Sequence, residues 1–569
     1  MRENLLTVPQ PSPNAVKTCF RVILMPHPLS MSFQMSIDEI FLSIGELGRQ
    51  QCIYGFLLCL LNGYAAFHML QYPFVSFNVD FTCSSSLAVQ SPPQPGEHEH
   101  FEPATNVSNT CPGGEVRACE DLYFATVSRS SIVSEWELVC DKSAATKMTM
   151  SAFMTGVMIG AFVLGKTADA YGRKFTMTVT TIGIILFNTV SGLVSSYKLY
   201  LLTKLVVGFF QAGFILASFV LVNELVGASK RTLMGVAFQS AFALFIVVMS
   251  AVAYLLQHWR QLTLAISALG APLLAINLVL PESPRWLLSK NRKKDAIKVM
   301  SDIARGNGEM FTDKMRLSLE DEKASAGEAA EVKVTEGLSD LFRTRQLAEV
   351  TIIQIYSWFV NSAAYYGLTL AAGAAGSADL YTATALSGAV EIPAYLLTYW
   401  LLGVAGRRGT LCLAMVTGGG ACLAIQLTAA LAPALTQSLA LLGKLCLAAS
   451  FAVVYIHSGE IFPTTVRNSG MGLVSVAARV GGIMAPFIVS LGEAVPHLQF
   501  TVLGVMSLAA GLLNLRLPET AGCELPDTIT DLVTVLRSSR SRSPVKKKTA
   551  RQKSIELESS GLLSDLDDE

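Results

Sequence analysis

Twelve apolar runs, each about as long as a membrane crossing, constrain this chain more than any other feature of its sequence. The hydrocarbon core of a bilayer is about 30 Å thick, so a helix needs roughly 20 apolar residues to cross it. Six runs precede a long polar stretch and six follow it: 51–77, 146–165, 176–196, 199–222, 233–256 and 260–280, then 350–371, 380–403, 410–432, 438–458, 469–491 and 498–516. The pattern predicts an all-α membrane protein with twelve transmembrane helices in two halves of six.

The composition agrees with residence in a bilayer and excludes several functions. Only 15% of the 569 residues are charged, whereas about 25% is typical of soluble domains. Lys+Arg and Asp+Glu both number 43, and this zero net charge argues against nucleic acid as a partner. The sequence contains neither a phosphate-binding loop for ATP nor a Ser/His/Asp or metal-ligand arrangement, so we expect no enzyme and no cofactor. His68 and His457 are isolated in apolar runs, and we expect neighbouring helices to satisfy the hydrogen bonding of their side chains.

A polar segment at residues 78–145 separates the first two predicted helices as one large loop. Four of the eleven cysteines cluster in it: Cys83, Cys111, Cys119 and Cys140. Four cysteines permit three pairings, and the sequence does not choose among them. The same segment holds Asn106-Val107-Ser108, an N-glycosylation acceptor. Together these features predict an extracellular, disulfide-bonded cap that is glycosylated at Asn106.

Lys and Arg in the short loops predict the orientation of the chain. They accumulate after the second, fourth, sixth, eighth and tenth helices, on the side opposite the cap, so we expect both termini in the cytoplasm and the protein in the plasma membrane. The predicted divisions are an N-terminal segment 1–50, a first half 51–280, a cytoplasmic linker 281–349, a second half 350–516 and a tail 517–569. In the tail, Glu558, Leu562 and Leu563 fit an acidic dileucine pattern for sorting adaptors, although so short a pattern also occurs by chance.

Three landmarks recur in the second half, in the same order and at equivalent helix ends. They are Gly172-Arg173 and Gly406-Arg407, 234 residues apart; Glu224…Arg231 and Glu460…Arg467, 236 apart; and Pro281-Glu282-Ser283 and Pro518-Glu519-Thr520, 237 apart. Two parallel copies of six helices, related by an axis along the membrane normal, are the architecture of the major facilitator superfamily. That architecture implies alternating access, in which the halves rock about a site near the middle of the membrane.

Charged residues at the predicted cytoplasmic helix ends are candidates for a gate, because such groups can pair in one state and separate in the other. The candidates are Asp169, Arg173, Glu224, Arg231, Glu460 and Arg467. The alternative is that the basic residues only set the topology. The second half has no acid equivalent to Asp169, so we expect its gate to be weaker.

Several longer motifs lie between residues 36 and 532: Asp38-Glu39 with Gly45-Glu46, Glu135-Trp-Glu-Leu-Val-Cys-Asp141, the 165–174 stretch, Pro281-Glu-Ser-Pro-Arg-Trp-Leu287, Tyr365-Tyr-Gly-Leu368, Glu391-Ile-Pro-Ala-Tyr395 and Glu460-Ile-Phe-Pro-Thr-Thr-Val-Arg-Asn468. Over this range the sequence resembles the organic cation transporter family, solute carrier family 22. Within the family, the sequence is most similar to the carnitine-transporter-like and fly-like branch. The resemblance implies transport of small organic cations, zwitterions or anions without nucleotide hydrolysis.

Two ionisable residues lie near the middle of predicted helices, where they are costly and so by default functional or paired: Glu391 and Arg479. Lys204 and Lys444 lie nearer helix ends and are interpreted as boundary residues that reach toward water. The resemblance implies that dedicated cation carriers have an acid at the position of Arg479, whereas anion and carnitine carriers have arginine. A Glu391–Arg479 salt bridge that only stabilises the bundle is the alternative.

The resemblance further implies which side chains line the substrate cavity: Gln239, Phe242, Trp358, Tyr365, Glu391 and Arg479. Phe219 and Tyr395 are added because aromatic faces attract ammonium groups. The leading hypothesis is therefore a carrier of zwitterions or anions similar to carnitine or betaine. An organic cation carrier and a non-transporting receptor or scaffold are the alternatives, and coupling to Na⁺ or H⁺ and simple exchange are equally supported.

Overall fold

The computed structural model describes residues 35–77, 79–84, 107–108, 121–124, 129–321, 338–371, 379–428, 432–463 and 466–521. The predictions for Asn106, Cys111, Cys119 and residues 558–563 lie outside these ranges, as does the side chain of Cys83.

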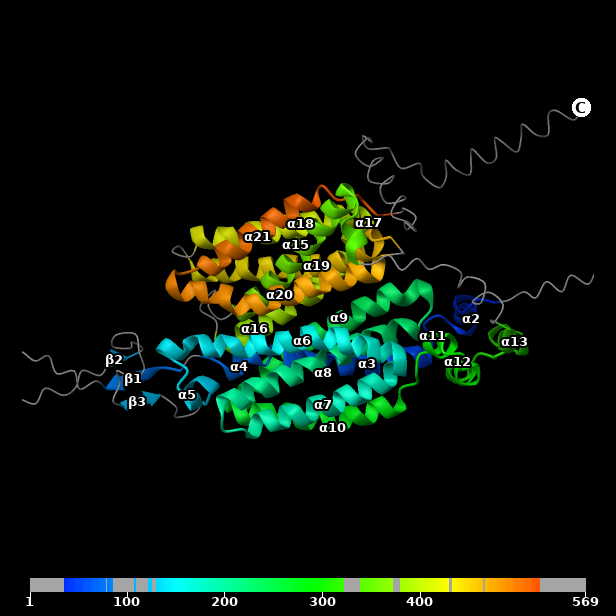
Figure 1. The fold of residues 1–569 in the computed structure, drawn as a ribbon, viewed down its shortest axis with the longest axis horizontal. Helices are drawn as coiled ribbons and strands as arrows, with labels where there is room; N and C mark the ends of the chain where they lie inside the picture. The colour runs from blue at the N-terminus through cyan, green and yellow to red at the C-terminus, as the bar shows by residue number, and fades with distance from the viewer. Residues whose placement is uncertain are drawn as a thin grey trace, which may run out of the picture.

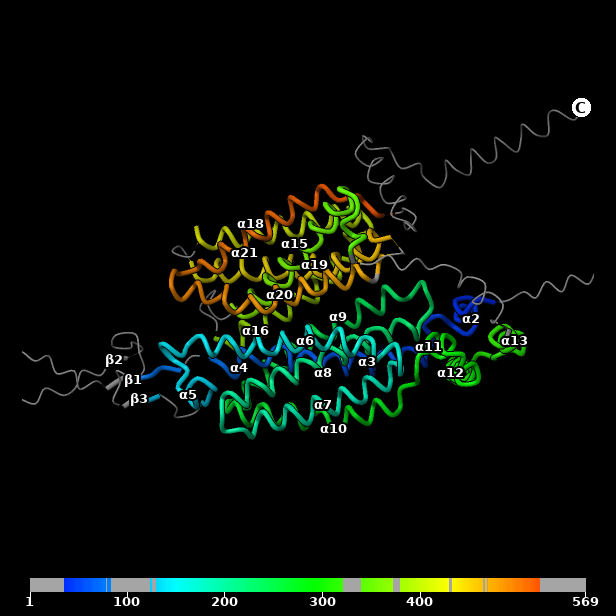
Figure 2. The backbone as a smooth tube through the Cα atoms, viewed as in Figure 1, coloured from blue at the N-terminus to red at the C-terminus, as the bar shows by residue number. Residues whose placement is uncertain are grey.

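Two bundles of long helices lie one above the other, the first half below and the second half above in Figures 1 and 2. The first half contains α3 (Arg49–Leu70), α6 (Ser143–Tyr171), α7 (Arg173–Leu193), α8 (Tyr197–Glu224), α9 (Arg231–Leu255) and α10 (Trp259–Val279). The second half contains α15 (Arg345–Leu370), α16 (Leu380–Ala389) with α17 (Glu391–Val404), α18 (Gly406–Thr428), α19 (Pro433–Ile461), α20 (Arg467–Ala494) and α21 (Leu498–Asn514). The predicted division into two halves of six crossings is confirmed.

Among the described residues, ten helices are long and apolar enough to cross a membrane. The other two crossings of the predicted twelve correspond to α21, which has 17 residues, and α15. The latter buries several polar side chains, among them Gln354, Ser357 and Asn361. Boundaries shift by a few residues: α15 begins at Arg345, inside the predicted linker, and the first crossing ends at Leu70 before a short helix, α4 (Tyr72–Val75).

The two ends of the bundle carry different structures (Figure 1). At one end, here called the cap end, β1 (Phe81–Ser84) pairs antiparallel with β2 (Val107–Ser108) and β3 (Asp121–Phe124), and α5 (Ile132–Trp136) follows. At the opposite end, here called the terminal end, lie α2 (Ile37–Ile44), α11 (Pro284–Ser289), α12 (Lys293–Asn307) and α13 (Asp313–Asp321).

The segment before α6 is fixed to the cap end of the first half. Trp136 donates its indole N–H to the Ser195 carbonyl at 2.8 Å. Glu135 accepts the indole N–H of Trp259 at 2.7 Å and pairs with Arg260. Cys140 is disulfide-bonded, which agrees with the predicted cap, while the choice of partner stays open.

The helix α2 begins with a capping box and is fixed to the terminal end of the first half. Ser36 Oγ accepts the Glu39 N–H at 3.3 Å, and the Glu39 carboxylate accepts the Ser36 N–H at 2.7 Å. Asp38 pairs with Arg231 at 2.9 Å and also with Arg285. The predicted N-terminal segment therefore contains a helix that packs on the bundle.

Polar contacts join the two halves toward the cap end. Lys147 on α6 pairs with Glu493 on α20 at 2.7 Å, and Ser151 donates to the Ile483 carbonyl at 2.9 Å. A Cβ at Gly388 on α16 would lie 2.7 Å from the Cβ of Ile246 on α9, so this close approach requires glycine. The bundle is thus closed at the cap end.

Candidate functional site

At the terminal end of the first half, one carboxylate caps the start of a transmembrane helix. Glu282 accepts the backbone N–H of Arg173 at 3.0 Å and that of Lys174 at 3.2 Å, where α7 begins. Gly172 has φ +104°, and a Cβ there would lie 2.2 Å from Glu282 Oε2. Burial raises the pKa of the Glu282 carboxyl, while its backbone hydrogen bonds and the Arg173 charge act in the opposite direction. The Gly-Arg and Pro-Glu landmarks are therefore two parts of one cap.

The side chain of Arg173 connects this cap with the end of α8. Its Nε lies 3.1 Å from Glu224 Oε2, and its Nη2 lies 3.3 Å from Asp169 Oδ1. The Asp169 side chain is 77% exposed, so solvent weakens that second pair more than the first. Arg173, Glu224 and Asp169 thus lie together, and all three belong to the first half.

The second half repeats the arrangement. Glu519 accepts the backbone N–H of Arg407 at 2.8 Å and that of Arg408 at 3.1 Å. Gly406 has φ +75°, and a Cβ there would lie 2.6 Å from Glu519 Oε2. Arg407 Nε lies 3.0 Å from Glu460 Oε2. The repeat seen in the sequence is therefore a repeat of one charged cap, and Arg407, Glu282 and Glu519 belong with the gate candidates although sequence reasoning left them out.

Two of the predicted gate residues have other partners. Arg231 pairs with Asp38 on α2, and Arg467 donates its Nε–H to the Phe462 carbonyl at 3.1 Å. Glu224 and Glu460 pair instead with Arg173 and Arg407. None of these pairs bridges the two halves within the described ranges, so a gating role remains a prediction.

The middle of the membrane contains a break in one crossing, between α16 and α17. Pro393 lacks an N–H and cannot continue the helical hydrogen bonding, so the predicted crossing 380–403 divides at Val390. Glu391 is the first residue of α17, where the positive end of the helix dipole favours a carboxylate. Its Oε2 accepts the hydroxyl groups of Tyr365 and Tyr395, both at 3.0 Å.

The partner of Glu391 is Lys444, which corrects the interpretation of that lysine as a boundary residue. Lys444 Nζ lies 3.0 Å from Glu391 Oε1, with side-chain exposures of 2% and 0%. The ammonium also donates to Thr369 Oγ1 at 2.6 Å and lies 3.2 Å from the ring centroid of Tyr365. A charge this far from water needs a counter-ion, and Glu391 supplies it. The alternative of a Glu391–Arg479 bridge is wrong in this conformation.

With Glu391 and Lys444 paired, the remaining ionisable residue that we placed near the middle of a helix is Arg479 on α20. It is half-buried and lies close enough to Tyr366 and Tyr455 to interact with them electrostatically. Its buried Nε has no hydrogen-bond partner, and no carboxylate of the described residues lies within ion-pair distance. Ile483, one turn nearer the cap end, already contacts the first half. Arg479 therefore lies just below the closed part of the interface.

A row of aromatic rings connects the buried ion pair with the neighbours of Arg479. Phe451 lies 5.6 Å from both Tyr365 and Tyr455, and Tyr366 lies 5.2 Å from Tyr365, centroid to centroid. Sequence reasoning missed Phe451, Tyr366 and Tyr455. The Tyr365-Tyr366 dipeptide could have indicated Tyr366. Successive residues of a helix point in different directions, so Tyr366 reaches neighbours other than those of Tyr365.

The other predicted lining residues fall into three situations. Phe242 packs in the same apolar cluster as Tyr365, with residues of both halves. Trp358 is 0% exposed and donates its indole N–H to Ser458 at 2.8 Å, so it lies within the core of the second half. Phe219 is 40% exposed and packs on Phe238, and Gln239 is half-buried. The structure thus brings Tyr365, Glu391, Tyr395 and Phe242 together, and Trp358 contacts the ring of Tyr455 at 4.2 Å between centroids.

A second buried lysine lies in the first half, and its partners among the described residues are amide oxygens and not a carboxylate. Lys204 donates to Gln71 Oε1 at 3.0 Å and to Asn188 Oδ1 at 3.1 Å, so it is not a boundary residue. Both ring nitrogens of His68 lack a partner among the described residues, which corrects the expectation for that histidine. His457, by contrast, contacts Gln354 and the Pro518 carbonyl as expected.

Comparison with known proteins shows that this chain is similar to membrane transporters. Residues 56–530 match the family described as "Sugar (and other) transporter". The chain is 34% identical to the "Organic cation transporter protein" of Drosophila melanogaster, covering 87% of this chain and 94% of that protein. It is 35% identical to "Solute carrier family 22 member 15" of Xenopus tropicalis, covering 88% and 91%, and 32% identical to "Solute carrier family 22 member 13" of Homo sapiens, covering 87% and 92%.

Among solved structures, the inward-open xylose transporter XylE from E. coli superposes with a TM-score of 0.57. The alignment covers 85% of this chain and 98% of XylE at 15% identity. At that identity the likeness concerns the fold alone, and it agrees with the predicted major facilitator architecture.

Proposed function

Because this chain belongs to solute carrier family 22 of the major facilitator superfamily, we propose that it carries small organic solutes bearing a carboxylate, either anions or zwitterions. Transport itself follows from the family, whose members are multi-pass membrane transporters and not enzymes. The choice of solute class is what we infer from the site.

The observation that carries this proposal is the pairing of Glu391 with Lys444. The pair is neutral as a whole, and the Glu391 carboxylate already accepts two tyrosine hydroxyls. Arg479 then provides the net charge of the central site, because it has no carboxylate partner in the described ranges. A guanidinium in a low-dielectric site attracts a carboxylate and repels a bare cation.

The aromatic residues expected to receive an ammonium group are partly occupied. The ring of Tyr365 holds the ammonium of Lys444, and its hydroxyl donates to Glu391. The rings of Tyr455 and Phe451 remain for the organic part of the solute. A solute similar to carnitine fits this proposal because its carboxylate can pair with Arg479. In this proposal the site does not select the solute by its quaternary ammonium group.

The mechanism we propose is alternating access between the state described here, closed at the cap end, and a state closed at the terminal end. The lysine and arginine distribution supports a cytoplasmic terminal end, so the present state would open to the cytoplasm. We propose that the charged caps around Arg173 and Arg407 hold the helix ends of each half as rigid units while the halves rock.

Uptake into vesicles that contain the full chain tests the solute class. An aryl carboxylate and carnitine should both enter, whereas tetraethylammonium should not. Arg479→Gln should lower carboxylate uptake at subsaturating solute by roughly 10- to 100-fold, because a hydrogen bond to a charged group is worth about 1.5–3 kcal/mol. Lys198→Gln, which removes an exposed charge at the start of α8, is the matched control.

The outcomes separate the alternatives. Entry of tetraethylammonium alone would refute the carboxylate proposal and favour an organic cation carrier, as the name of the Drosophila relative reads. Binding of carboxylates by the purified protein without flux would favour a receptor. Equal losses in Arg479→Gln and Lys198→Gln would remove Arg479 from the site.

A further inference from the structure

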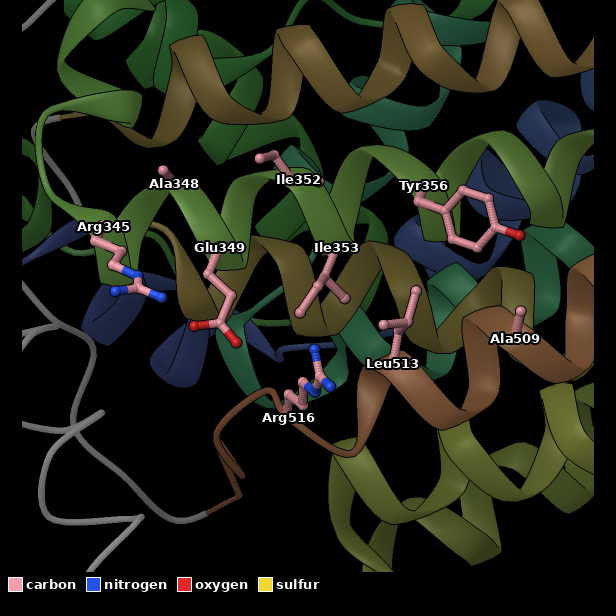
Figure 3. A pocket seen from close by; sticks show the side chains of 9 residues that line it. All are labelled: Arg345, Ala348, Glu349, Ile352, Ile353, Tyr356, Ala509, Leu513 and Arg516. Atoms are coloured by element: carbon pink, nitrogen blue, oxygen red, sulfur yellow. The ribbon is translucent and has the colours of Figure 1, made fainter.

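A groove runs along the outside of the second half, between α15 and α21. It has a volume of about 640 Å³ and nine lining residues: Arg345, Ala348, Glu349, Ile352, Ile353, Tyr356, Ala509, Leu513 and Arg516. Figure 3 shows the three charged side chains at one end of the groove, with the apolar lining continuing toward Tyr356. Ile352 is 58% exposed although it belongs to a membrane-crossing helix. This face of the bundle therefore exposes an apolar side chain on a membrane-crossing helix.

The length of the groove corresponds to one leaflet. Arg345 is the first residue of α15, and Arg516 follows the end of α21 by two residues, so both guanidinium groups lie at the level of the lipid headgroups. Tyr356 is eleven residues along α15 from Arg345, which places it roughly 16 Å deeper at 1.5 Å per residue. Half of a bilayer core is about 15 Å thick. One acyl chain thus spans the apolar part.

The charges at the headgroup level are unequal. Two guanidinium groups and one carboxylate, Glu349, line that end of the groove, which leaves a net positive charge. Arginine binds phosphate through two parallel N–H donors. The first turn of α15 adds the positive end of its helix dipole at the same level. This end of the groove has the chemistry of a phosphate site.

We propose that this groove binds one anionic phospholipid from the leaflet at the terminal end. Arg345 and Arg516 hold the headgroup phosphate, and the acyl chain lies along Ile352 and Leu513. The proposal requires only that the chain spans a membrane, and it does not depend on which solute is carried. Since α15 also carries Tyr365, which donates to Glu391, a bound lipid supports the helix that positions the central ion pair.

Native mass spectrometry of the purified full chain, titrated with phosphatidylglycerol or phosphatidylcholine, tests the site. The wild type should bind the first phosphatidylglycerol more tightly than phosphatidylcholine. A basic residue near an anionic lipid surface contributes about fivefold in affinity, so Arg345→Gln with Arg516→Gln should weaken that binding roughly 25-fold. The control, Arg343→Gln with Lys290→Gln, removes two exposed charges at the same end and should leave it unchanged.

Two further variants keep the proposal falsifiable if the arginine variant is unstable. Glu349→Gln removes the carboxylate of the groove and should tighten phosphatidylglycerol binding severalfold. Ala509→Trp fills the apolar part and should weaken the binding of the first lipid. Tighter lipid binding in the first variant and weaker binding in the second are expected together only if the headgroup and the acyl chain occupy the two ends of this groove.

Any of three results would overturn the proposal. These are equal affinity for the two lipids, an equal loss in the control pair, or weaker binding in Glu349→Gln. The acidic end of the chain, Asp565, Asp567, Asp568 and Glu569, is the competing occupant. If phosphatidylglycerol bound preferentially only after these four residues were changed to amides, the groove would belong to the tail and the lipid proposal would be wrong.

Discussion

Removing one member of the Glu391–Lys444 pair should destabilise the protein far more than removing both. Glu391→Gln keeps an oxygen that can accept hydrogen bonds from Tyr365 and Tyr395, so its effect reports the lost charge. The ammonium of Lys444, with 2% side-chain exposure, would then keep only neutral partners, the Thr369 hydroxyl, the Tyr365 carbonyl and the Tyr365 ring. Leaving one charge of a buried pair unpaired costs about 3–5 kcal/mol.

The double variant provides the decisive measurement. Lys444→Met leaves the Glu391 carboxylate without its counter-ion and should cost a similar amount. Glu391→Gln with Lys444→Met removes both charges, and such replacements of a buried pair are often neutral. We therefore expect the melting temperature of the purified protein to fall strongly in each single variant and to recover in the double variant.

An exposed ion pair of similar geometry gives the control. Arg316 and Glu320 lie 3.1 Å apart with side-chain exposures of 60% and 43%, and Glu320→Gln should cost less than about 1 kcal/mol because solvent screens exposed pairs. If the losses of the two single variants simply added in the double variant, Glu391 and Lys444 would not act as a pair. The argument that Arg479 supplies the net charge of the site would then fail.

Three further expectations follow from single contacts. Gly406→Ala places a Cβ 2.6 Å from the carboxylate that caps α18, at φ +75°, and should cost about 1–2 kcal/mol in a melting experiment. Gly403→Ala, which has nothing within 4 Å, should cost little. Lys147→Met removes the described ion pair between the halves, whose acid is 60% exposed, and should reduce the cap-closed population by no more than about fivefold in spin-label distance measurements. Lys204→Met removes a buried ammonium whose described partners are amide oxygens and not a carboxylate, so the melting temperature should hold or rise, in contrast to Lys444→Met. A fall as large as that of Lys444→Met would contradict the view that Lys204 lacks a charged partner.

The sequence was sufficient to predict the fold because the thickness of the membrane sets the length of each apolar run. Runs of about twenty apolar residues can only cross as helices when every backbone group must be satisfied within its own segment. The landmark at Gly172 and its copy at Gly406 then revealed the duplication, since both need a backbone conformation that glycine adopts readily. The half-to-half symmetry of the charged caps follows from the same residues.

What the sequence alone did not determine is which buried charges are partners. Glu391 and Arg479 were the prominent charges by their position along their helices, and Lys444 was read as a boundary residue from the same criterion. Depth along one helix says nothing about which face meets which neighbour, and the rotation of α19 against α17 is what brings Lys444 within 3.0 Å of Glu391. A salt bridge between residues 53 positions apart depends on the packing of several helices at once. The sequence therefore determined the architecture and the inventory of buried charges, and only the tertiary structure decided that the pair is neutral and that Arg479 remains for the solute.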